Sequence, residues 1–179
     1  MPASDQPLDT PLWAFSLAVY SRDGVADECL DLQERLKLDV NLLLFAAFTG
    51  AVEGVTLDQR DIAAACGAVA RWHDDVVRTL RTARHALKAP SLDAGNPYRD
   101  ASAGLRAQVK PAELDAEKIE LGMLWQWSRR ELAGRPRSAS DQALAANLRG
   151  VLEFYRLSGD QAAAACPRLL DAAAAYARG

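Results

Sequence analysis

The sequence contains little histidine and little cysteine, and this limits the chemistry that it can carry. Two histidines and three cysteines occur among 179 residues. Cys29, Cys66 and Cys166 lie far apart, each on a predicted helix among apolar residues, with no second cysteine at metal-ligand spacing. We interpret them as buried, reduced thiols. A disulfide framework and a multi-histidine metal site are therefore not expected, and the sequence predicts no cofactor.

Long apolar runs, β-branched residues and aromatic residues are also scarce. The most apolar run, 42–48, is far shorter than the roughly 20 residues that span a membrane. The first nine residues have neither a basic segment nor an apolar one, so we expect no signal peptide. Half of the residues are hydrophobic, many of them alanine, which favours helices over sheets. With a formal net charge of -3, we expect a soluble, cytoplasmic, all-α protein.

Apolar residues at helical spacing divide the chain into parts. We expect a disordered lead over 1–9 and then one helical domain, 10–179, of six or seven helices. N-terminal core helices occupy 10–50, a long antiparallel hairpin occupies 56–134, and C-terminal helices occupy 138–179. Within the first part, Asp39 caps a very apolar helix that we expect to stop at Gly50.

The hairpin consists of a central helix over 58–88 and a returning helix that begins near Tyr98. Both carry an apolar stripe at helical spacing. The second stripe continues through Pro111, which predicts either one kinked helix or two helices placed end to end.

The N-terminal part resembles a known protein family. The residues that carry the resemblance are the run 12–20, Gly24-Val25 with Cys29, Leu32 and Gln33, and the run 39–45, followed later by Trp72, Val76-Val77, Leu80-Arg81, Arg84 and Leu87-Lys88. They resemble the opening and the next block of an uncharacterised proteobacterial family known only as a domain of unknown function. The resemblance implies a bacterial, soluble, helical protein, and it carries over no catalytic residue.

Positive charge gathers at the predicted hairpin tip. The bases there are Arg78, Arg81, Arg84, His85, Lys88, Arg99 and Arg106. If Lys88 lies across from Tyr98, helix pairing neutralises the middle of the hairpin but not its tip. Wheel positions place Arg78, Arg81, His85 and Lys88 on the face opposite the apolar stripe. We therefore expect the positive face of 78–88 to be outward and without an internal partner. Basic residues at a helix C-terminus also complement its dipole, which is the plainer explanation.

Two functional hypotheses follow from these patterns. The first is a non-enzymatic interaction or regulatory protein whose basic tip binds an unidentified macromolecule with an acidic or phosphate surface. The alternative is an enzyme or small-ligand binder with a pocket between the N-terminal helices and the central helix. The residues that could converge there are Trp13, Tyr20, Gln33, Asn41 and His73. A deep polar pocket would favour the alternative, and a filled core would favour the first.

Several carboxylates have suggestive spacing but incomplete motifs. Asp27 and Asp31 lie one helical turn apart, as in magnesium-diphosphate sites, but no second such pair exists, so we interpret them as a solvated face. Glu113, Glu117 and Glu120 share a helix but lack the Glu-x-x-His partner of di-iron bundles.

One histidine and two tryptophans allow more than one interpretation. His73 precedes two aspartates, which suggests a metal or general-base role, but it falls on the apolar side of its helix. We therefore favour a core or boundary histidine with one hydrogen bond. Trp125 and Trp127 face different directions, and either core packing or a partner contact explains them.

Overall fold

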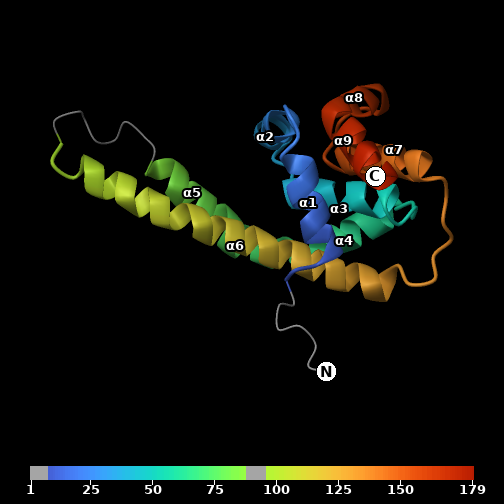
Figure 1. Ribbon diagram of the computed structural model, residues 1–179, viewed down its shortest axis with the longest axis horizontal. Coiled ribbons are helices and arrows are strands. Elements are labelled where there is room, and N and C mark those ends of the chain that lie inside the picture. The colour runs from blue at the N-terminus through green and yellow to red at the C-terminus, as the bar shows by residue number, and fades with distance from the viewer. Residues whose placement is uncertain (1–7, 88–95) are drawn as a thin grey trace.

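A computed structural model describes residues 8–87 and 96–179 (Figure 1). The described residues form only helices and connecting segments, which confirms the all-α class. The helices are α1 (Pro11–Tyr20), α2 (Val25–Leu36), α3 (Val40–Ala51), α4 (Gln59–Trp72), the π-helix η1 (His73–Val77), α5 (Arg78–Ala86), α6 (Arg99–Glu131), α7 (Ser140–Phe154), α8 (Gly159–Ala164) and α9 (Pro167–Arg178). Since α4, η1 and α5 run on without a break, the described ranges hold eight separate helices.

Helix α3 is the centre of the core. The side chain of Asp39 accepts a hydrogen bond from the backbone N–H of Asn41 and caps the helix. Every residue of α3 is buried. The sequence predicts that α3 ends at Gly50, but in the structure Gly50 lies inside the helix and against α7. A Cβ at Gly50 would lie 2.5 Å from the Cα of Leu144, so the glycine permits close approach of the two helices.

One hydrophobic core joins α3 to side chains from both halves of the chain. Phe45 of α3 meets Trp127 edge to face, with ring centroids 6.0 Å apart. Phe48 meets Trp125 in the same way at 5.8 Å. Core packing thus accounts for both tryptophans of α6.

The central helix contains a π-turn that the sequence pattern does not reveal. Asp58 and Asp61 form a capping box at its start. At η1 the backbone N–H of Arg78 bonds to the carbonyl of His73, five residues earlier. The wider turn changes the direction in which the following side chains point, and it begins at His73.

Helix α6 is a single helix of 33 residues with Pro111 inside it. Of the two arrangements predicted around Pro111, one helix or two helices placed end to end, the structure shows one continuous helix. Its first half runs beside α5 and projects from the rest of the molecule, and its second half passes beneath α1, α3 and α4 (Figure 1). We call α5 with residues 99–117 of α6 the arm. Among the described residues, no helix is both long enough and apolar enough to cross a membrane.

The predicted lead lies outside the described residues up to residue 7. Leu8 and Asp9 are described and lie against α6, where the ammonium of Lys118 is 2.5 Å from Asp9 Oδ1. The division of the chain into a lead and a helical domain stays a prediction.

Candidate functional site

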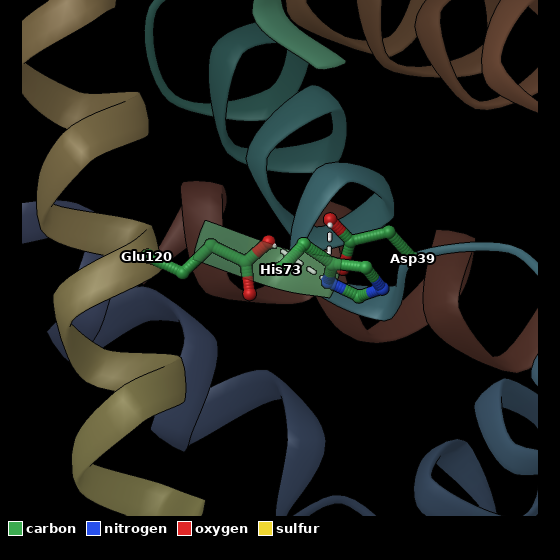
Figure 2. A group of neighbouring side chains, drawn as sticks. All are labelled: Asp39, His73 and Glu120. Carbon is green, nitrogen blue, oxygen red and sulfur yellow. Dashed lines mark hydrogen bonds and ion pairs between the residues drawn. The ribbon is translucent and has the colours of Figure 1, made fainter. Parts of the chain in front are cut away.

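Three polar side chains from separate parts of the chain meet inside the molecule (Figure 2). Asp39 comes from the N-terminus of α3, His73 from the first residue of η1, and Glu120 from the middle of α6. His73 Nδ1 lies 3.0 Å from Glu120 Oε1 and 3.5 Å from Asp39 Oδ2. The side chains of His73, Asp39 and Glu120 are 15%, 6% and 0% exposed. We call these three residues the Asp–His–Glu cluster.

Asn41 fixes the orientation of both carboxylates. Its side-chain Nδ2 donates a 2.8 Å hydrogen bond to Glu120 Oε2, and its backbone N–H donates a 2.8 Å bond to Asp39 Oδ1. Each carboxylate is thus held through the oxygen farther from the histidine. The other oxygen of each, Oε1 and Oδ2, is turned toward His73 Nδ1, as Figure 2 shows.

Burial and mutual charge determine how the cluster holds protons. Burial raises the pKa of Asp39 well above its ordinary value, and the charge of Glu120 adds to the effect. Burial lowers the pKa of His73, but the hydrogen bond to Glu120 and the charges of Asp39 and Glu120 outweigh it and leave a raised pKa. The pKa values of Asp39 and His73 are therefore both raised.

Two residues of the cluster, Asp39 and His73, line an open cleft of about 970 Å³ between α2 and the continuous α4–η1–α5 helix. Cys66 and Tyr155 line it as well, and we call these four lining residues the floor of the cleft. The Tyr155 hydroxyl accepts a 3.2 Å hydrogen bond from the backbone N–H of Asp39. Cys66 is half-buried rather than buried as expected, and burial raises the pKa of its thiol. The floor therefore combines an imidazole with buried oxygen groups, and it is reached from outside.

The five residues proposed from the sequence for a pocket lie in different places relative to this cleft. His73 and Gln33 line the cleft. Asn41 lies behind it, where it orients the carboxylates. Tyr20 and Trp13 are outside the lining; burial raises the pKa of Tyr20 to about 12, and the ammonium of Lys118 lies 5.3 Å from the Trp13 ring. Two of the five residues therefore border the cleft, and Asn41 supports it.

The expectation that the basic face of the arm lacks an internal partner is wrong for Arg81 and Arg84. Arg81 Nε donates to Glu113 at 3.1 Å, and its Nη2 donates to Glu117 at 2.6 Å. Arg84 binds Glu113 through both Nε and Nη2. Both arginines thus reach glutamates that follow Pro111 in α6. The pairing of Lys88 with Tyr98 expected from the sequence lies outside the described residues. The glutamates of α6 thus neutralise these two arginines.

The other predicted basic residues fall into different environments. Arg78 is exposed and pairs with Asp74 at 2.8 Å on the same helix. His85 and Arg99 are exposed, and Arg106 is half-buried. Lys88 lies outside the described residues. Whether these groups bind an anionic partner stays a prediction.

The fold and the site define an all-helical protein with a buried carboxylate–histidine cluster beneath an open cleft. The chain belongs to the family described as "Protein of unknown function (DUF2390)", whose model matches residues 11–124 and confirms the predicted resemblance. The matched segment includes Asp39, Asn41, His73 and Glu120 and ends before α7. No curated protein and no solved structure matches the chain.

Proposed function

We propose that the protein binds a small organic anion in the cleft between α2 and the α4–η1–α5 helix. The observation that supports this most is the cleft itself, whose volume lies in the range of known ligand pockets and whose floor holds buried polar groups. This corresponds to the alternative hypothesis drawn from the sequence. The bacterial and cytoplasmic setting expected there stays a prediction.

The lining suggests the chemistry of the ligand. Apolar side chains on the α2 side include Leu30 and Leu38, and Val69 lies opposite on α4. Basic side chains also line the cleft, namely Lys37, Arg78, Arg81, Arg84 and His85, together with the acidic Glu34, Asp39 and Asp74. Arg81 and Arg84 bind glutamates of α6 and Arg78 binds Asp74, whereas Lys37 forms no ion pair among the described residues. A guanidinium has five N–H donors, so these arginines keep donors beyond their ion pairs, and such donors suit carboxylate or phosphate groups. An anion with an apolar portion fits this arrangement, with its charged group toward Lys37 and the remaining N–H donors of the arginines.

A cleft-filling substitution tests the proposal. Ala70 lines the cleft, whereas Ala68 on the same helix is exposed and outside the lining. Thermal unfolding is measured with malate, citrate, glucose 6-phosphate and a short-chain fatty acid, for wild type, Ala70→Trp and Ala68→Trp. A compound that stabilises wild type and Ala68→Trp but not Ala70→Trp supports the proposal. Equal stabilisation of the two variants contradicts it.

A second candidate function retains the arm as a surface for an acidic or phosphate-bearing macromolecule. It is favoured by the projection of the arm from the body and by the exposure of Arg78, His85 and Arg99 (Figure 1). Charge reversal of Arg78 and Arg99 is expected to abolish co-purification of such a partner at low salt. If every partner stays bound to the reversed variant, this second function is refuted.

A further inference from the structure

We propose that Asp39, His73 and Glu120 together bind a divalent transition-metal ion. The donor atoms of these three residues all lie within 4.8 Å of one another. An ion bonded to nitrogen and oxygen at about 2.1 Å holds adjacent donors roughly 3.0–3.4 Å apart. The separations of His73 Nδ1 from the two carboxylate oxygens, 3.0 and 3.5 Å, are close to this spacing.

The outer contacts of the two carboxylates are those typical of metal ligands. A ligating carboxylate is usually held by a hydrogen bond to its other oxygen, which fixes the oxygen that faces the metal. Asn41 does this for both carboxylates, through its side chain to Glu120 and through its backbone to Asp39. The π-turn that begins at His73 fixes the third ligand, and π-turns within α-helices occur frequently at functional sites.

Charge points to the same conclusion. Among the described residues, the ion pairs of Asp39 and Glu120 are formed with His73 alone. A single N–H at His73 Nδ1 cannot be donated fully to two carboxylates that both approach it (Figure 2). A divalent ion in place of that proton would satisfy all three donors and balance the two buried carboxylates.

The donor set and its access indicate the kind of ion. One imidazole with two carboxylates suits Zn²⁺, Mn²⁺ or Fe²⁺ better than Mg²⁺ or Ca²⁺, which prefer oxygen donors alone. Because Asp39 and His73 border the open cleft, an ion can enter from it, and positions beyond the three protein ligands would face the cleft. The site would therefore be able to hold water or a ligand group on the metal.

The metal site shares the floor of the cleft with the proposed anion site but does not require the anion. Metal binding is measured on the full chain after chelator treatment, by calorimetric titration with Zn²⁺ and separately with Mn²⁺, without any organic acid. Failure of the metal site would leave the anion screen unaffected, and failure of that screen would leave the metal titration unaffected.

Isosteric variants identify the ligands. Glu120→Gln and Asp39→Asn keep the shape of the side chains, and asparagine still caps a helix. Each is expected to weaken Zn²⁺ binding by about 100-fold or more, since even outer contacts of a metal site contribute 10–100-fold. Asp74→Asn is the matched control, because Asp74 lines the same cleft next to His73 but lies outside the cluster. It is expected to leave the affinity within about threefold of wild type.

A measurement on the wild-type chain keeps the test independent of variant folding. Electron spin-echo modulation of bound Mn²⁺ is expected to show a directly coordinated imidazole nitrogen, and the signal should persist in His85→Gln, which removes the other histidine. The proposal is overturned if wild type binds neither ion more tightly than about 1 mM. It is equally overturned if the nitrogen signal is absent, or if Asp74→Asn weakens binding as much as Glu120→Gln.

Discussion

Glu113 is the residue whose replacement should most clearly separate internal from exposed charge pairing in the arm. It is buried, with 5% of its surface exposed, and it accepts hydrogen bonds from both Arg81 and Arg84. The two arginine side chains are themselves only about one-fifth exposed. Glu113→Gln keeps the shape of the side chain but removes the charge between the two guanidinium groups.

The structure sets the expected magnitude. Removing one partner of a buried ion pair costs about 3–5 kcal/mol. Glutamine retains one acceptor oxygen, and Glu117 still holds Arg81, so we expect Glu113→Gln to lower the free energy of unfolding by about 2–3 kcal/mol. The matched control is Asp74→Asn, which removes the exposed pair between Asp74 and Arg78 and should cost about 0.3–0.5 kcal/mol.

Urea unfolding followed by circular dichroism measures both variants, and a midpoint shift at constant slope gives the change in unfolding free energy. A double-mutant cycle with Arg84→Met isolates the coupling between Arg84 and Glu113. If Glu113→Gln costs no more than Asp74→Asn, the two arginines are solvated rather than paired, and internal pairing in the arm is refuted.

Three further predictions follow from the same structure. Burial raises the pKa of Glu113, but the hydrogen bonds from Arg84 and Arg81 outweigh burial and leave this pKa lowered. The stability from this pair should be complete above the ordinary pKa of about 4.3 and disappear as pH falls through the lowered folded value, so that the urea midpoints of wild type and Glu113→Gln converge as the pH is lowered below about 4.3. Gly50→Ala should lower the free energy of unfolding by about 3 kcal/mol, because the added Cβ would meet the α7 backbone. Gly67→Ala has open space around the added Cβ and should raise the free energy of unfolding by about 0.5–1 kcal/mol in the same urea titration. Equal effects of the two substitutions would refute the tight α3–α7 contact. Asn147→Ala should lower the thermal midpoint with a loss of about 3 kcal/mol, because Asn147 is fully buried and makes three hydrogen bonds to backbone groups; a loss below about 1 kcal/mol would contradict those bonds.

Most of the architecture could be predicted from helical periodicity. The segment 40–51 is apolar on all sides, which requires burial, and it is the centre of the core. The stripe of the returning helix is unbroken at Pro111, and the helix is continuous there. Both are local properties of the sequence, and so they are visible without the structure.

The candidate site depended on long-range geometry that periodicity does not contain. The sequence pattern at Asp39 indicates only a helix cap, a role that uses Oδ1 and leaves Oδ2 free to face His73. The pattern at Glu120 indicates only part of an incomplete di-iron motif. The π-turn at His73 changes the helical phase, and Arg81 reaches Glu113 and Glu117 on the other helix of the arm, so neither feature could be read from a regular helical wheel.

The proposed metal ion would bind where Asp39, His73 and Glu120 converge beside the cleft. The most direct measurement is a crystal structure of the protein grown with Mn²⁺, with an anomalous difference map. We predict a single strong peak about 2.0–2.3 Å from His73 Nδ1, Asp39 Oδ2 and Glu120 Oε1. A map without a peak between these atoms, or with peaks only at exposed carboxylates, would contradict the account.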